Sequence, residues 1–476
     1  MFRSDHSRQQ PELEQFIAHL IKFKKRYLLS LAIIILLIPA TVNLLMGKPL
    51  LMGPEGYYHL QQARELSWGN LHYFPLQIIS LLLPLDALFI VPLLLAVISM
   101  VLLLKIIKGT SLPEELVFFC LLFLILSPGF IYNYSTLSAN SYFLFLSILG
   151  IYLFSRKNNA VKLLGLIPLA AASWFNAFFT LLIALIFSFY ACFSKKDRLP
   201  ALSIVILLLL SALLNAILLG QSILPPEFHD QNLITSLISA FGAVGGISLF
   251  FLLLALIGLA ITWKKKFFSI FYLFFIVVLG GYLFSQELVF FLSIMITFFA
   301  AVAFLFLIRQ PWQLPLIKKF TLFIIILGIL FSTLSYLNRV NLNDPSAAQV
   351  ETLQWIRENT SADAIILSST QHVDYIHYFA ERRAVQDLYK DKNYVAGQYR
   401  ALVGALQVDE LQQLLDTHGI TILYLTPDLK QLLPAGQGSL SLLNTENFKL
   451  VHSNQELEVW FYQKRAVSEQ ASRPDK

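Results

Sequence analysis

Charged residues are scarce in this chain of 476 residues, in which Lys, Arg, Asp and Glu together make up only 13%. Soluble domains carry about 25% of these residues. Hydrophobic residues, in contrast, make up 57% of the chain. So few charged residues cannot form a polar surface around so many hydrophobic ones. The composition therefore excludes an ordinary soluble enzyme. It indicates an α-helical protein that crosses a membrane several times.

Cysteine is almost absent, since only Cys120 and Cys192 occur and both lie inside apolar runs. This excludes a disulfide framework and a cysteine-based metal site. The chain also lacks a Gly-rich phosphate loop, an HExxH motif and a nucleophile elbow. The small residues "GAVGG" at 242–246 are typical of close helix packing in a membrane rather than of a cofactor site.

Long apolar runs are what the chain does contain. A span needs about 20 residues to cross the hydrocarbon core, and by this measure we predict about 11 spans. They cover residues 27–46, 86–104, 116–132, 136–154, 160–173, 175–193, 199–219, 238–262, 267–284, 287–308 and 319–337.

Three further segments near the amino terminus do not count as ordinary spans or loops. The run 74–84 is too short to cross, so we predict a re-entrant or interfacial piece within an external loop at 47–85. The first span has a basic flank but no small-residue cleavage site, which argues against a cleaved signal. Residues 12–24, within a cytoplasmic terminus at 1–26, have the pattern of an amphipathic surface helix.

Lys and Arg occur at every second break between the spans. Since cytoplasmic loops collect these residues, we predict a cytoplasmic amino terminus and an extracytoplasmic carboxyl-terminal part in a multi-pass cell-membrane protein. No predicted cytoplasmic loop is longer than about a dozen residues. The basic breaks are 22–26, Lys105 with Lys108, 156–162, 195–198, 264–266 and 309–319.

From residue 338 the composition becomes that of a soluble domain. A start signal at 344–346 precedes Ala348, Leu353 and Ile356 at helical spacing, with Val350 and Trp355 widening the apolar face. Strands are predicted at 364–369, within "RAVQD", at 421–426 and in a terminal hairpin, with helices at 373–380, 394–406 and 409–417. We therefore predict that the spans at 27–337 are followed by an extracytoplasmic α/β domain at 338–465 and a disordered tail at 466–476.

The external stretch 51–66, "LMGPEGYYHLQQAREL", brings together the clearest candidate site residues. Pro54 is suited to the first position of a helix, and Glu55 then lies in the first turn, where the helix dipole favours an acid. His59 follows four residues later on the same face. Glu55 is either a general base or metal ligand, or only an acid that caps a helix. Tyr57 and Tyr58 are either substrate contacts or aromatics at the membrane interface.

Other polar residues on the external side are weaker candidates. Glu227, His229 and Asp230 offer oxygen and nitrogen ligands for a divalent cation, or form only a solvated loop. Glu287 borders an apolar run, where a carboxylate is either functional or hydrated at the interface. Arg64 is suited to bidentate contact with a phosphate, or pairs with Glu65 or a lipid headgroup.

The acid followed by Tyr-Tyr-His in "EGYYHLQQAREL" resembles the first external loop of the GT-C membrane glycosyltransferases, and more closely that of the single-subunit oligosaccharyltransferases of archaea and bacteria. A second similarity is "LQWIRENTSADAIILSSTQHVDYIHYFAERRAVQD", which keeps Asp374, Tyr375, Arg382 or Arg383, and Asp387 of a family stretch. It lacks the tryptophans and the glycine of that stretch. The break at 127–142 also lacks the acids that complete the family's metal site.

The resemblance implies a transferase that takes a sugar or oligosaccharide from a polyprenyl-phosphate-type donor on the external side. The acceptor would be a protein, a lipid or a glycan; no nucleic acid partner is expected. Glu55 and His59 would be catalytic, with Mg²⁺ or Mn²⁺ held by Glu55, Glu227, His229 and Asp230. Substrate contacts would come from Tyr57, Tyr58, Arg64, Glu287, Asp374, Tyr375 and Arg382.

Two other functions stay open at the level of the sequence. The first is a GT-C relative without catalysis that serves as a binding or assembly subunit in envelope-glycan synthesis, which the missing acids at 127–142 favour. The second is a transporter or flippase. Against it stand the lack of paired broken segments in corresponding halves and the presence of a soluble domain.

Overall fold

The computed structural model describes residues 22–65, 73–109, 112–175, 177–193, 198–219, 237–239, 246–263, 268–282, 288–341, 344–388, 408–432, 446–455 and 457–463. The chain forms two compact units. The membrane unit comprises the residues up to Leu45, Leu50–Met52 and Leu66–Asn343. The C-terminal unit comprises Met46–Pro49, Gly53–Glu65 and the residues from Asp344 onward. The second unit thus includes a short segment that lies between apolar runs in the sequence.

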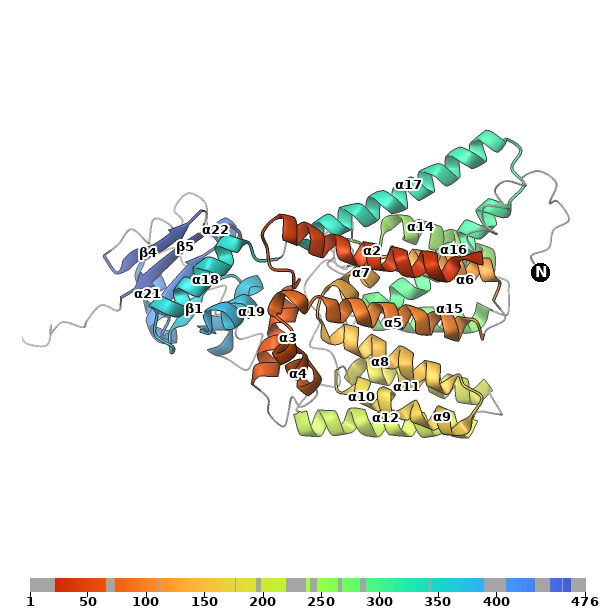
Figure 1. Ribbon diagram of the computed structural model, residues 1–476, viewed down its shortest axis with the longest axis horizontal. Helices are drawn as coiled ribbons and strands as arrows, with labels where there is room; N and C mark the ends of the chain where they lie inside the picture. Colours follow the sequence, from red (N-terminus) through yellow and green to blue (C-terminus); the bar gives the residue numbers. More distant parts are fainter. Residues whose placement is uncertain are drawn as a thin grey trace, which may run out of the picture. The chain divides into compact units, whose positions relative to one another are not determined.

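Helices make up the described part of the membrane unit (Figure 1). They are α2 (Lys24–Leu45), α4 (Phe74–Leu82), η2 (Leu85–Ala87), α5 (Ile90–Ile107), α6 (Glu114–Ile125), α7 (Pro128–Ser135), α8 (Ala139–Phe154), α9 (Asn159–Leu164), α10 (Leu166–Ser173), α11 (Ala177–Phe193), α12 (Arg198–Leu219), α14 (Leu249–Thr262), α15 (Ser269–Tyr282), α16 (Val289–Arg309) and α17 (Pro315–Val340).

Each predicted span overlaps at least one of these helices, but not every helix is long enough to cross a bilayer. Among the described residues, five helices have the length and composition of a span: α2, α5, α12, α16 and α17. The count rises to 6 if α6 and α7, bent by 59° at their junction, form one span. Several apolar runs fold into shorter helices of 10–17 residues, such as α8 and α14. The protein is a multi-pass membrane protein, and the predicted count of spans remains a prediction.

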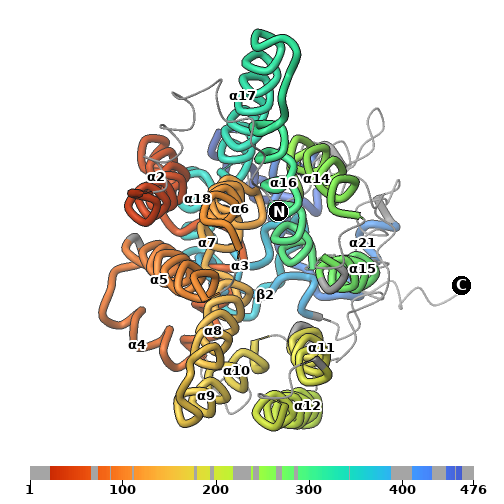
Figure 2. The backbone as a smooth tube through the Cα atoms, turned by 90° about the vertical axis from the view of Figure 1, so that its right-hand side faces the viewer, coloured from red at the N-terminus to blue at the C-terminus, as the bar shows by residue number. Residues whose placement is uncertain are grey.

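Two groups of contacts organise the membrane unit. The helices α2, α5, α8, α10 and α12 form a series in which each contacts the next, and Figure 2 shows this series nearly along the helix axes. The helix α16 contacts α6, α14, α15 and α17 and is the most buried of the spans. Gly258 permits the close approach of α14 to α16, because a Cβ there would lie 2.0 Å from the carbonyl oxygen of Phe299 in α16.

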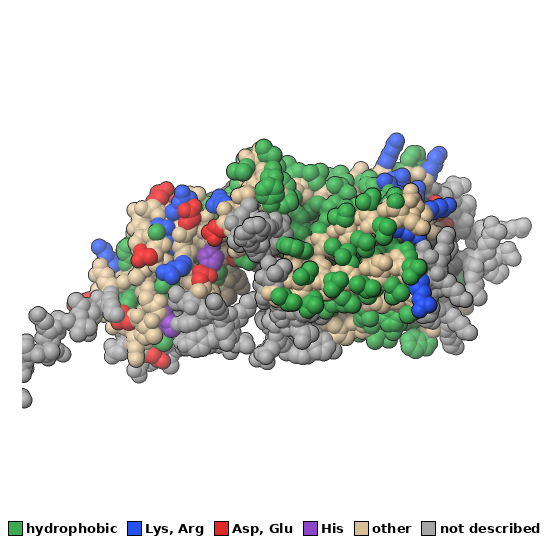
Figure 3. All heavy atoms as spheres, turned by 90° about the horizontal axis from the view of Figure 1, so that it is seen from below, with side chains coloured by type: hydrophobic (Ala, Val, Ile, Leu, Met, Phe, Trp, Pro, Cys, Tyr) green, Lys and Arg blue, Asp and Glu red, His purple; other side chains and the backbone are tan. Residues whose placement is uncertain are grey.

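Basic side chains gather at one end of the membrane unit, beyond a broad hydrophobic face (Figure 3). Lys24 at the start of α2 pairs with Glu114 at 2.9 Å, and Arg309 at the end of α16 pairs with Glu115 at 3.4 Å. Lys105, near the end of α5, lies over the ring of Tyr152. Among the described residues, basic side chains that are far apart in the sequence therefore share one end of this unit.

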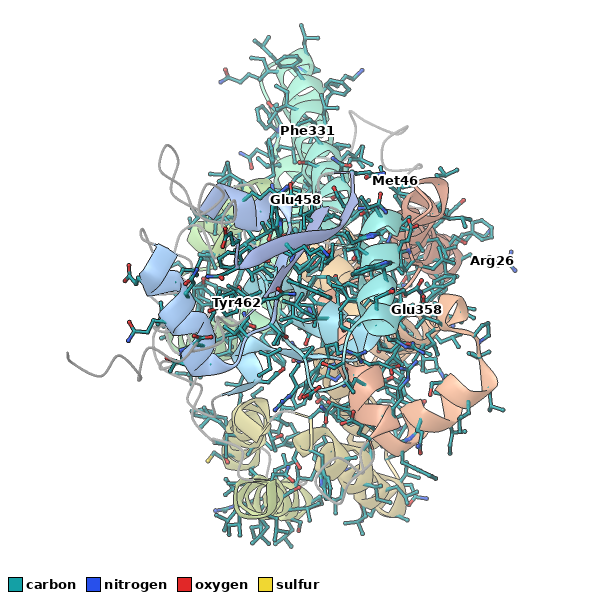
Figure 4. The ribbon with its side chains drawn as sticks, turned by 90° about the vertical axis from the view of Figure 1, so that its left-hand side faces the viewer. Arg26, Met46, Phe331, Glu358, Glu458 and Tyr462 are labelled. Carbon is teal, nitrogen blue, oxygen red and sulfur yellow. The ribbon has the colours of Figure 1, made fainter. Side chains whose placement is uncertain are left out.

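Most apolar side chains of the helix α17 are not covered by protein. Only 28% of its most apolar stretch is buried within the protein. Phe331, labelled in Figure 4, is 70% exposed. Apolar side chains that are not covered by protein in a helix of 26 residues are stable when they face hydrocarbon. This is the surface expected of a span at the edge of a membrane domain.

The C-terminal unit is built around a five-stranded sheet in the order β2-β1-β3-β5-β4. The neighbours of β1 are parallel to it, whereas β5 is antiparallel to both β3 and β4. Its strands are β1 (Ile365–Leu367), β2 (Arg383–Ala384), β3 (Ile422–Leu425), β4 (Phe448–Asn454) and β5 (Leu457–Tyr462). The predicted strands and the terminal hairpin are confirmed.

Helices cover the sheet. On one face, α21 (Val408–His418) and α22 (Pro427–Leu432) bury leucines against β1 and β3. Two residues of β5 labelled in Figure 4 hold these helices: Glu458 pairs with Lys430 at 2.8 Å, and Tyr462 donates to Asp416 at 3.1 Å. The helix α18 (Ala347–Asn359) contacts β4 and β5. The predicted helix at 409–417 is confirmed, whereas 394–406 lies outside the described residues.

The start of α18 follows from its sequence. Ser346 is the N-cap and forms a capping box with Gln349, in which each side chain bonds the other residue's backbone N–H. Leu353 and Ile356 are fully buried, as their spacing predicts. The predicted helix at 373–380 is also present, as α19 (Val373–Tyr375) continued by the π-helical turn η8 (Ile376–Ala380).

Candidate active site

The stretch that contains Glu55 folds as the helix α3 (Pro54–Arg64), which belongs to the C-terminal unit. Gly53 is the N-cap, with a φ of 77° that favours glycine, and Pro54 occupies the first turn. The helix start predicted from Gly53-Pro54 is therefore confirmed. Glu55 lies in the first turn and is half-buried. The dipole of the helix favours the ionised form of a carboxylate at this position.

Two sides of α3 differ sharply in burial. Gly56, Tyr57, His59, Leu60 and Ala63 form the buried side. Glu55, Tyr58 and Gln62, spaced by three and four residues, share the side that is at least partly exposed. Tyr58 is 44% exposed, whereas His59 is only 5% exposed. Of the two residues predicted to be catalytic, Glu55 is thus the more accessible one.

Tyr57 is completely buried in a socket of aromatic rings. Its ring centroid lies 5.3 Å from that of Tyr375, 5.2 Å from that of Tyr378 and 5.1 Å from that of Phe379. Edge-to-face and tilted arrangements at these distances are favourable. Tyr57 and Tyr375, both predicted to contact substrate, have under 3% of their surface exposed, so their observed contacts are with protein.

Arg64 closes the other end of α3 against the turn η8. Its Nη2 donates a hydrogen bond of 2.9 Å to the hydroxyl of Tyr378, and its guanidinium lies 4.4 Å from the centre of that ring. Glu381 lies 4.0 Å from Arg64 and 3.3 Å from Arg357. The side chain of Arg64 remains 54% exposed, and its predicted contact with a phosphate remains a prediction.

Asp374 is in a small polar cluster next to Tyr58. Burial raises the pKa of the Asp374 carboxyl above its ordinary value, while nearby His377 acts to lower this pKa and Asp387 to raise it. Burial and the charge of Asp374 together raise the pKa of Tyr58. His377 Nε2 lies 2.6 Å from Asp387 Oδ2. Asp374 thus lies among groups that can exchange protons or bind polar substrate atoms.

Arg382 has a clear structural role. Its guanidinium donates to the carbonyl oxygens of Arg357 at 2.6 Å and Thr360 at 2.7 Å. These carbonyls belong to the last turn and the C-cap of α18, where a cation is stabilising. Its predicted contact with substrate remains a prediction.

The described residues contain no group of three or more His, Cys, Asp and Glu that could hold a metal ion. Of the predicted ligands, Glu227, His229 and Asp230 lie outside the described residues, as does Glu287 among the predicted substrate contacts. The predicted divalent-cation site therefore remains a prediction.

Two anchoring residues could not be recognised in the sequence. Asp344 accepts a hydrogen bond of 2.8 Å from the backbone N–H of Gly53, and its own carbonyl accepts one of 3.4 Å from Lys48. Tyr378 contacts both Tyr57 and Arg64. The sequence signal for Asp344 was the start of a helix at Asp-Pro-Ser, and that signal does not reveal a partner almost 300 residues away.

Comparison with known proteins places the fold. No protein-family model and no curated protein sequence matches the chain. Among solved structures, the oligosaccharyltransferase AglB of Archaeoglobus fulgidus, in complex with an inhibitory peptide and dolichol phosphate, has a TM-score of 0.56 at 12% identity. The match covers 95% of this chain and 75% of that one. The same enzyme in its apo form gives 0.55 at 12% identity, over 85% of this chain and 70% of that one.

A second kind of enzyme matches over nearly its whole length. ArnT of Cupriavidus metallidurans, bound to undecaprenyl phosphate, has a TM-score of 0.51 at 10% identity, covering 94% of this chain and 99% of that one. At identities this low, the structural similarity shows a shared fold and nothing finer. The expected resemblance is confirmed at that level: the fold of the chain is similar to that of GT-C membrane glycosyltransferases.

Proposed function

We propose that this protein is a membrane glycosyltransferase that moves a sugar from a polyprenyl-phosphate-type carrier to an external protein, lipid or glycan. One observation supports this above all. The chain shares its fold, over 94% of its length or more, with two transferases whose structures contain dolichol phosphate or undecaprenyl phosphate. These two proteins differ from one another in how much of their length this chain matches, yet both bind a polyprenyl phosphate.

In this proposal Glu55 is the general base. Its carboxylate takes the proton of the acceptor's nucleophilic O–H or N–H, and the nucleophile forms a bond to the anomeric carbon of the sugar. The bond between that carbon and the phosphate oxygen breaks, and the phosphate leaves with the electron pair. The position of Glu55 in the first turn of α3 supports this role, because the carboxylate is half-buried there and the dipole favours its charged form.

The orientation proposed for the chain is that of the sequence analysis. The basic end of the membrane unit, formed by residues such as Lys24, Lys105 and Arg309, would face the cytoplasm. The start of α2 would then be inside, and the C-terminal unit with α3 would be extracytoplasmic. A thiol reagent that cannot cross membranes would label a cysteine introduced at Glu65 in intact cells, but not one introduced at Arg156.

The test of the proposed reaction is sugar transfer from polyprenyl-linked donors by purified protein in liposomes. Wild type is compared with Glu55→Gln, and Glu65→Gln is the matched control at the exposed end of the same helix. Loss of a general base typically reduces turnover by about 10²–10⁴-fold. We expect this loss for Glu55→Gln and near-normal turnover for Glu65→Gln, with Mn²⁺ and Mg²⁺ each added and omitted.

One observation favours a second candidate, a non-catalytic binding or assembly subunit. The break at 127–142, where related enzymes carry further acids, has none, and half of it folds as the buried helix α7. This candidate predicts that folded wild-type protein binds polyprenyl phosphate but transfers no sugar from any donor. Equal turnover of wild type and Glu55→Gln would instead show that transfer occurs without this base.

A further inference from the structure

The helix α3 is fixed to the rest of the C-terminal unit at three points along its length. At its start, the N–H of Gly53 donates to Asp344 at 2.8 Å. In its middle, Tyr57 fills the socket of Tyr375, Tyr378 and Phe379. At its end, Arg64 donates to the hydroxyl of Tyr378 at 2.9 Å. Tyr57 and Arg64 are seven residues apart, which is almost two helical turns, so both lie on nearly the same side of α3.

These contacts determine whether α3 holds its position at all. An isolated helix of fewer than about 12–15 residues is only marginally stable in water, and α3 has 11 residues. Its first turn receives no side-chain cap from Gly53. The helix therefore depends on packing, and Tyr57 is its largest fully buried side chain.

The position of Glu55 depends on the same contacts. Glu55 lies two residues before Tyr57 and points to the opposite, partly exposed side of α3. A general base must come within hydrogen-bond reach of the proton that it removes. A misplacement of about 1 Å can reduce turnover by about 100-fold.

We propose that Tyr57 and Arg64 are positioning residues, through which the C-terminal unit holds Glu55 for catalysis. This inference rests on the proposed role of Glu55 as a base. In this view the catalytic base is itself a residue of the C-terminal unit. The turn η8 is the element that does so, since Tyr378 and Phe379 belong to it, and π-helical turns occur frequently at functional sites.

The test combines kinetics with a direct measurement of the mobility of α3. A nitroxide is attached to a cysteine introduced at the exposed Glu65, after Cys120 and Cys192 have been replaced by alanine. Tyr57→Ala removes the ring from the socket, whereas Tyr57→Phe keeps it. The matched control is Phe448→Ala, which removes a buried ring from the same unit at its contact with Tyr462, away from the socket residues.

We expect Tyr57→Ala to increase the mobility of the label and to lower kcat by about 100-fold, while KM changes by less than about threefold. Tyr57→Phe should restore both the wild-type spectrum and most of kcat. Phe448→Ala should leave the spectrum unchanged. A mobile α3 with normal kcat would overturn the inference, as would an equal loss of kcat in Phe448→Ala.

The two proposals can fail separately. If wild type transfers no sugar, the proposed function fails, and with it the positioning role. The mobility of the label then still decides whether the aromatic socket fixes α3. If wild type is active and Glu55→Gln is inactive, but Tyr57→Ala frees α3 without loss of kcat, the base is retained and only the positioning role is rejected.

Discussion

Two short helices, α3 and α7, begin in the same way and have opposite surroundings. Each starts with a proline in its first turn, Pro54 in one and Pro128 in the other. All but one of the residues of α7 are buried, and it has no charged residue. Ser127 accepts from the N–H of Phe130, and Asn133 donates to Gly129 at 2.7 Å, whereas Tyr134 donates to Ser99 on α5 at 3.0 Å. In contrast, the charged residues of α3 lie on its half-buried or exposed side, and Arg64 bonds Tyr378, far along the chain.

The difference shows where chemistry can occur in this protein. A buried helix without a charged residue, such as α7, offers no carboxylate to a substrate and serves for packing. A helix with a half-buried carboxylate and an exposed tyrosine on one side can act on a substrate.

The largest effect is expected when an acid is placed on α7. Asn133 is only 5% exposed, and its side chain donates to the carbonyl oxygen of Gly129. The variant Asn133→Asp would bury a carboxylate without a cation, which we expect to cost about 3–5 kcal/mol of stability. The loss can be measured as a lower thermal midpoint in detergent. An unchanged midpoint would mean that this break can accept a charge, and that α7 is not the closed packing element described here.

An intermediate effect is expected when the start of each helix is weakened. Asp344→Ala removes the acceptor for the N–H of Gly53 and should cost about 1–3 kcal/mol. Ser127→Ala removes the cap of α7 and should cost about 0.5–2 kcal/mol. Only Asp344→Ala should increase the mobility of a label at Glu65. An equal increase in both variants would contradict the view that α3 and α7 are anchored separately.

The smallest effect concerns pH and the acid next to Tyr58. Because the pKa of Asp374 is raised in the folded protein, its stabilising contribution is fully present below its unfolded pKa of about 3.9 and is lost as pH rises through the folded value. Asp374→Asn should therefore become more stable relative to wild type as pH increases over this range. His377, Asp387 and Tyr58 face this carboxyl. A difference in thermal midpoint that does not vary with pH would contradict this.

Local features were predictable because the signals lie within a few residues. The cap at Ser346, the glycine and proline that start α3, and the strands of the C-terminal sheet all follow from adjacent residues. The apolar runs likewise showed where the membrane helices lie. They did not show that a run such as the one containing α14 would yield a helix of only 14 residues.

The assignment of α3 to the C-terminal unit could not be predicted. Tyr57 looks like an interfacial aromatic in the sequence, and its socket lies more than 300 residues further along the chain. The side of α3 that is buried was also hidden, because His59 and Glu55 are four residues apart and yet differ in exposure. The structural role of Arg382 was equally hidden, since its partners are backbone carbonyls that no sequence pattern identifies.

The most direct test of the central claim is single-turnover transfer by Glu55→Gln protein that has been loaded with a polyprenyl-phosphate-linked sugar. The account predicts that this variant binds the donor as wild type does and transfers sugar to an acceptor about 10²–10⁴-fold more slowly, while Glu65→Gln transfers at nearly the wild-type rate. Transfer by Glu55→Gln at the wild-type rate would contradict the claim that α3 carries the catalytic base.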